Sequence, residues 1–257
     1  MKRGITRTAS GNATKRDVLK LLGAGAALSA TGTGVAAAQH GGHGGGGTTT
    51  TQTSQARSCP QPNCIDPELG YTMLSPGPLP QRMRPTERVQ LLIGPKTLTV
   101  GPQEPPLDFY FEPVGLRIDP GTVVSFDFVT PEHGVTGYHV LQGRQQRVPE
   151  SVPPLTSPTL AGNRSWLYRF DEPGVYDLFC PPHEAYGMAM RIVVGDEPGP
   201  IVRGESTGGD EEGPELRPPL PASAAVLDDP QLQPQNIVDS GRVSWASLNV
   251  TGQPMQG

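Results

Sequence analysis

Three side chains between Val175 and Val194 have the chemistry to bind a soft metal ion. Cys180, His183 and Met188 supply a thiol, an imidazole and a thioether at the spacing Cys-x2-His-x4-Met. Strand-like residues begin at Val175 and resume before Val194, so the three side chains lie on a loop between two predicted strands. A loop of this length brings three donors to one ion while the strands hold its two ends.

This donor set predicts one copper ion of type 1, in which a thiolate and two imidazoles form a trigonal plane and a methionine is a weak axial ligand. Thiolate and thioether favour Cu(I), whereas imidazole suits Cu(II), so a mixed set binds both oxidation states with little rearrangement. Little rearrangement favours rapid electron transfer. Met190 is an alternative axial ligand, but it requires a longer loop.

The residues around this loop predict short β-strands. Apolar and polar residues alternate in 124–128 and 166–170, which places every second side chain on one face. Turn signals such as Asp119-Pro120-Gly121 separate the apolar runs, and residues 86–196 show no sustained helical period. We therefore expect an all-β domain over residues 86–196, built as an antiparallel β-sandwich of seven or eight strands.

The rest of the chain differs from this domain in composition. Residues 1–38 have a basic start, an apolar run and a small-residue exit, which predicts a cleaved export signal. Part of it resembles a twin-arginine signal, with Lys15 in place of the first arginine. We expect a low-complexity tether over 39–85, an acidic linker rich in Pro and Gly over 197–222, and a tail over 223–257 that packs on the sandwich or docks on a partner.

Export places the chain outside the cytoplasm, in the periplasmic space or on the outer face of the cytoplasmic membrane, with membrane tethering as an open alternative. Disulfides persist in such a compartment, and Cys59 and Cys64 are close enough in sequence for a local disulfide. Cys180 then remains a free thiol. In an oxidising compartment a free thiol requires burial or a metal, which agrees with its place in the predicted site.

Net charge limits the classes of partner. Residues 1–38 hold six of the 20 basic and one of the 25 acidic side chains, so the remainder carries 14 basic and 24 acidic side chains. Such an acidic protein is unsuited to nucleic acid and favours basic docking partners.

The second imidazole of the trigonal plane must come from elsewhere in the chain. Within the predicted domain, His133 and His139 are the two candidates. His133 comes shortly after a predicted strand that ends at Val129, whereas His139 would require a shift of strand and turn. The residues alone leave this choice open.

The segment Pro131-Glu132-His133-Gly134-Val135 resembles the Pro-His-Asn-Val element of plastocyanin-like cupredoxins. Together with the Cys180 loop, it makes residues 105–196 similar to a plastocyanin- or halocyanin-type cupredoxin. The resemblance implies a Greek-key β-sandwich, one type 1 copper, and as its ligands His133, Cys180, His183 and Met188. Gly134 stands where the family has an asparagine that connects the two ligand loops by hydrogen bonds, so the residue with this role is not assigned.

The resemblance also implies a one-electron carrier that is either soluble or associated with a membrane surface and that serves redox partner proteins, an electron donor and an acceptor. All four metal positions are filled by protein, and five histidines do not supply the further copper sites of copper enzymes, so we expect no enzymatic activity. The alternative functions are copper storage, delivery or tolerance, and an interaction module that presents residues 226–250.

Overall fold

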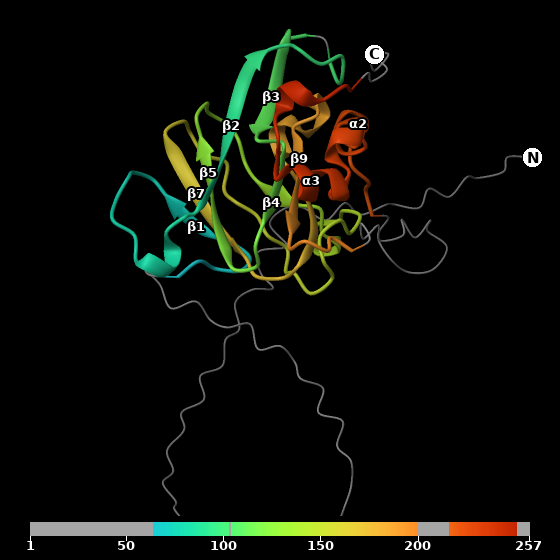
Figure 1. Ribbon diagram of the computed structural model, residues 1–257. Coiled ribbons are helices and arrows are strands. Elements are labelled where there is room, and N and C mark those ends of the chain that lie inside the picture. The colour runs from blue at the N-terminus through green and yellow to red at the C-terminus, as the bar shows by residue number, and fades with distance from the viewer. Residues whose placement is uncertain (1–63, 103, 200–215, 251–257) are drawn as a thin grey trace, which may run out of the picture. The chain divides into compact units, whose positions relative to one another are not determined.

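The structure is a computed structural model, and it describes residues 64–102, 104–199 and 216–250. Within these residues two β-sheets of five strands each enclose a common apolar core (Figure 1). The expected all-β sandwich is therefore confirmed. No helix in the described part of the chain is long and apolar enough to cross a membrane. The predicted export signal over residues 1–38 lies outside the described residues, as does Cys59.

The first sheet has the strand order β1-β7-β5-β2-β3. Neighbouring strands are antiparallel except β2 and β5, which run parallel. Its strands are β1 (Tyr71–Met73), β2 (Glu87–Pro95), β3 (Leu107–Glu112), β5 (Thr122–Phe128) and β7 (Arg164–Phe170).

The second sheet carries the predicted metal-binding loop and has the order β10-β4-β9-β8-β6. Here β4 and β9 are the parallel pair, and the other neighbours are antiparallel. Its strands are β4 (Gly115–Ile118), β6 (Thr136–Gly137), β8 (Gly174–Phe179), β9 (Ala189–Val194) and β10 (Arg242–Val243).

The alternation seen in the sequence of β5 and β7 sorts their side chains between two faces. Val124, Phe126 and Phe128 of β5 belong to the main core, whereas Val123 joins a smaller cluster on the other face. Burying side chains of this size contributes about 1.5–3 kcal/mol each to the stability of the fold.

Residues 64–85 pack against the first sheet and supply its edge strand β1, whereas their composition predicts a tether. Met83, on the short 3-10 helix η1 (Gln81–Met83), is buried with Val123 and Leu167. The indole N–H of Trp166 donates to the carbonyl oxygen of Leu69 over 2.8 Å, which satisfies the one polar group of a buried ring. Prolines and polar residues interrupt this segment, so its sequence has no periodic pattern that would predict the packing.

The C-terminal segment packs beside β9 and β4 of the second sheet (Figure 1). Val226, Leu232 and Ile237 of this segment are fully buried in the main core. Its elements are α2 (Pro221–Leu227), η4 (Pro230–Leu232), α3 (Pro234–Ser240) and η5 (Trp245–Ser247).

Candidate metal centre

The ligand loop, residues Cys180–Met188, joins β8 to β9. Pro181 begins the 3-10 helix η3 (Pro181–Tyr186), for which proline is suited because its fixed φ fits a first helical turn. Gly187 ends η3 at φ 89°, a left-handed conformation that favours glycine. The backbone N–H of Cys180 donates to the Met188 carbonyl oxygen over 2.9 Å, which closes the loop.

His133 reaches the site from the turn between β5 and β6. The N–H of Leu160 donates to the His133 carbonyl oxygen over 2.9 Å, and the N–H of Ser157 donates to the Val135 carbonyl oxygen over 2.8 Å. In return, the N–H of Val135 donates to the hydroxyl oxygen of Ser157 over 2.9 Å. The stretch 155–160 of the long loop before β7 therefore holds the backbone that carries the first histidine.

Three donor atoms of the predicted ligands converge on one point. Cys180 Sγ lies 3.7 Å from His133 Nδ1 and 3.5 Å from His183 Nδ1, and the two Nδ1 atoms are 3.2 Å apart. A circle through atoms at these separations has a radius of about 2.0 Å, close to the ~2.0–2.3 Å bonds that first-row metal ions form with imidazole and thiolate. The donor set therefore fits a copper ion of type 1.

A threonine orients the ring of His133. Thr130 Oγ1 lies 2.8 Å from His133 Nε2, and the same hydroxyl lies 3.4 Å from the Leu91 carbonyl oxygen. With Nε2–H donating to Thr130 and the hydroxyl donating to Leu91, the Nδ1 lone pair points toward Cys180. Partners of this kind fix the tautomer of metal-binding histidines.

Gly134 connects the two parts of the site that the missing asparagine would join. Its backbone N–H donates to Cys180 Sγ over 3.4 Å. A Cβ at this position would meet the side chain of Pro181 at 3.4 Å and the hydroxyl of Ser157 at 3.8 Å. An asparagine side chain at this position would therefore lie between the ligand loop and the 155–160 stretch.

Burial sets the protonation of the donors in the absence of a metal. It lowers the pKa of His133 to about 4, with a further contribution from the charge of His183, and it also lowers the pKa of His183. Burial raises the pKa of the Cys180 thiol to about 12. At neutral pH both imidazoles are neutral donors, whereas the thiol must exchange its proton for the metal ion.

The other predicted residues divide between the site and its surroundings. Met188 is fully buried at the end of the ligand loop, whereas Met190 lies on β9, opposite Leu178 of β8. His139 is outside the cluster of three donors. It is 6% exposed, and its Nδ1 accepts a hydrogen bond from the N–H of Leu141 over 3.1 Å. The structure thus brings His133, rather than His139, to Cys180 and His183.

The predicted free thiol also has a counterpart in the structure. Among the described cysteines Cys180 is free and buried, and Cys64 is disulfide-bonded. Thr130 and Ser157 could not be predicted as parts of the site, because no spacing rule connects either residue to the metal-binding motif.

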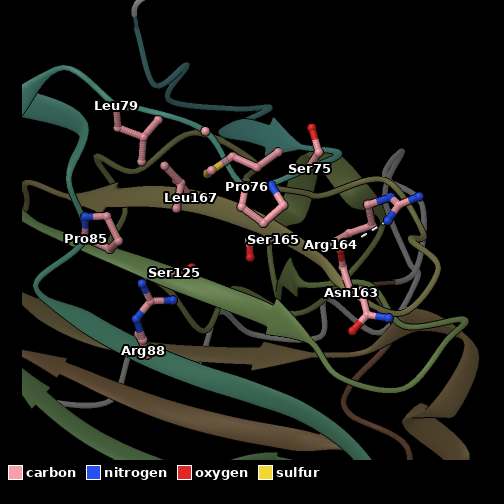
Figure 2. A pocket seen from close by; sticks show the side chains of 12 residues that line it. Ser75, Pro76, Leu79, Pro85, Arg88, Ser125, Asn163, Arg164, Ser165 and Leu167 are labelled. Atoms are coloured by element: carbon pink, nitrogen blue, oxygen red, sulfur yellow. Dashed lines mark hydrogen bonds between the residues drawn. The ribbon is translucent and has the colours of Figure 1, made fainter.

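A cavity of about 330 Å³ lies apart from this site, between the 73–85 segment and strands β5 and β7 (Figure 2). Three of its polar side chains already have partners within the chain. Arg88 forms an ion pair with Asp127, and the hydroxyls of Ser125 and Ser165 donate to the same carboxylate. None of the predicted metal ligands lines this cavity.

Comparison with known proteins agrees with the metal centre. A sequence model described as copper binding proteins of the plastocyanin/azurin family matches residues 103–195. A putative pseudoazurin from Rhizobium leguminosarum bv. viciae is 38% identical over 88 residues, which are 34% of this chain and 52% of that protein. The pseudoazurin of Paracoccus pantotrophus is 33% identical over 88 residues, which are 34% of this chain and 54% of that protein.

The chain thus spans about half the length of these curated relatives. Among solved structures, the pseudoazurin of Methylobacterium extorquens AM1 is 25% identical, with a TM-score of 0.33 over 44% of this chain and 77% of that one. The expected likeness to cupredoxins and the expected copper cofactor are confirmed by the family match and the donor set. Residues 103–195 therefore match the plastocyanin/azurin family of copper-binding proteins, and the donor set is that of a type 1 copper site.

Proposed function

We propose that this protein carries single electrons and holds one copper ion through His133, Cys180, His183 and Met188. The triangle formed by Cys180 Sγ and the two Nδ1 atoms, with sides of 3.2 to 3.7 Å, is the observation that supports it. Copper in this donor set would supply a Cu(I)/Cu(II) couple.

The residues around the site suit electron transfer better than catalysis. His133, Cys180 and Met188 are fully buried, so water is excluded from most of the site. His183 is half-buried and is the donor nearest to solvent, which makes its ring the natural entry point for an electron. With all four positions taken by side chains no position is left for a substrate, so we propose no enzymatic role.

We also propose that the protein works outside the cytoplasm. The basic and apolar pattern of residues 1–38 supports export. The excess of acidic side chains after residue 38 supports redox partner proteins, a donor and an acceptor, with basic docking surfaces.

Reconstitution with Cu(II) tests the proposed function. The full chain should develop an intense visible absorption from thiolate-to-copper charge transfer, and a reductant should bleach it reversibly with copper retained. Cys180→Ser should abolish the colour. Met188→Leu should shift the absorption, whereas the matched variant Met190→Leu should leave it unchanged. Colour retained by Cys180→Ser would disprove the ligand assignment, and release of copper on reduction would favour storage or delivery instead.

A further inference from the structure

Glu184 follows His183 directly in the ligand loop, yet its carboxyl group points into the protein and is 3% exposed. The hydroxyl of Tyr138 donates to Oε1 over 3.0 Å. The Arg144 guanidinium forms a buried ion pair with Oε2. A buried carboxylate is costly unless it is paired and hydrogen-bonded, and here both oxygens have partners.

The C-terminal segment supplies two more contacts to the same residue. The backbone N–H of Leu220 donates to Glu184 Oε1 over 3.1 Å. The hydroxyl of Ser223, on α2, donates to the backbone carbonyl oxygen of Glu184 over 2.8 Å. The start of α2 is thus attached both to the side chain and to the backbone of the residue beside His183.

Arg144 contacts the loop on the other side of the cysteine as well. Its guanidinium lies over the ring of Phe179, 4.5 Å from the ring centroid, and Phe179 immediately precedes Cys180. Arg144 also reaches toward the C-terminal segment, with 3.4 Å between Nη1 and the Pro218 carbonyl oxygen. One buried side chain thus connects the residue before Cys180, the residue after His183 and the C-terminal segment.

Stability alone is a weak reason for this arrangement. Replacing a buried ion pair by apolar residues of similar volume is often neutral or stabilising, whereas a paired and hydrogen-bonded charge fixes one specific geometry. The geometry fixed here is that of the backbone on either side of two predicted copper ligands.

We propose that Glu184 is a positioning residue of the copper site, and that through it Arg144 and the C-terminal residues 218–223 hold His183 in place. This inference rests on the proposed function, because a fixed His183 matters only if the loop binds copper. The C-terminal segment is then part of the support of the metal centre.

Two variants of the full chain test this inference. Ser223→Ala removes one hydrogen bond from α2 to the loop, and Glu184→Gln removes the charge that pairs with Arg144. In both, copper should pass to an excess of a chelator about ten-fold faster, because loss of outer contacts of metal ligands lowers metal affinity by about ten-fold or more and such losses fall mainly on the dissociation rate. The reduction potential and the visible spectrum of the loaded protein should shift too, and a loss of fold stability alone does not produce these shifts.

Ser240→Ala is the matched control, because the Ser240 hydroxyl donates to the Asn236 carbonyl oxygen within α3 and not to the ligand loop. It should leave the potential, spectrum and transfer rate unchanged. If Glu184→Gln does not fold, Ser223→Ala decides alone. If the wild type becomes coloured and Ser223→Ala has the same potential, spectrum and transfer rate as the wild type, only this inference is overturned. If the wild type binds no copper, the proposed function is overturned and this inference with it.

Discussion

The phenyl ring of Phe109 lies against the imidazole of His183, with ring centroids 4.0 Å apart and an interplanar angle of 17°. Phe109 belongs to β3 of the first sheet, whereas His183 lies on the loop that the second sheet carries. The first sheet therefore restrains a predicted copper ligand that the second sheet supplies.

Phe109→Leu should weaken copper binding while preserving an apolar contact at this position. Aromatic stacking contributes about 0.5–1.5 kcal/mol beyond area burial. Loss of that contribution should lower the affinity for copper by roughly two- to ten-fold. Competition with a chelator of known affinity measures the change.

Tyr110→Leu is the control for this prediction. Tyr110 is the next residue of β3, and its ring stacks on Trp245 with centroids 5.4 Å apart, not on a predicted ligand. An equal loss of affinity in both variants would show that general packing of β3, and not stacking on His183, is responsible.

His133→Ala and His139→Ala should have opposite effects on the copper site. His133 Nδ1 belongs to the cluster of three donors, so His133→Ala should abolish the visible absorption. His139 hydrogen-bonds the Leu141 N–H at the start of η2 (Val140–Gln142), so His139→Ala should retain the colour and lower the free energy of unfolding by about 1 kcal/mol. The reverse pattern of colour would make His139 the ligand.

The predictable part of the site is the part that is local in sequence. The spacing of Cys180, His183 and Met188 within one loop is enough to place them together. The choice between His133 and His139 depends on hydrogen bonds with Leu160 and Ser157, from a long loop without periodic residues. No sequence pattern connects such distant segments, so resemblance to a family had to supply the first histidine.

The fold, like the site, is predictable only where its pattern is local in sequence. Alternation identifies strands whose apolar side chains alternate with polar ones, as in 124–128. In β9 every residue is buried, because the C-terminal segment packs on this strand in addition to the rest of the sandwich. The seven-residue helix α2 is too short for a visible helical period and has no side-chain cap. Its packing, and that of residues 64–85, depends on tertiary contacts alone.

Thr130→Val should weaken copper binding without disturbing the fold. Valine has nearly the same shape but cannot accept a hydrogen bond from His133 Nε2, which lies 2.8 Å from Thr130 Oγ1. Loss of such a partner lowers metal affinity by about 10- to 100-fold. Thr130→Ser retains the hydroxyl and should retain most of the affinity, measured by the same chelator competition. A normal affinity in Thr130→Val together with a low affinity in Thr130→Ser would point to the methyl group instead.

Asp177 pairs with two buried arginines in the second sheet, and Asp177→Asn should destabilise the protein. Its carboxylate accepts from Arg147 Nε and from Arg191 Nε, each over 2.7 Å. Removing the charge leaves two buried guanidiniums without a counter-ion, which costs about 3–5 kcal/mol. Urea unfolding of the copper-free protein at pH 7 measures this loss. The exposed pair of Arg169 and Asp171 provides the control, since Asp171→Asn should cost at most about 1 kcal/mol.

The pH dependence of the same difference identifies its electrostatic origin. Burial alone would raise the pKa of Asp177, but the charges and hydrogen bonds of Arg191 and Arg147 outweigh burial and hold that pKa below its usual value. The unfolded chain takes up this proton near pH ~3.9, so the contribution of Asp177 is complete above that pH and is lost as the pH falls toward the folded pKa. The gap in unfolding free energy between wild type and Asp177→Asn should therefore be smaller at pH 3 than at pH 7. A gap of the same size at both values would mean that Asp177 acts through packing and not through its charge.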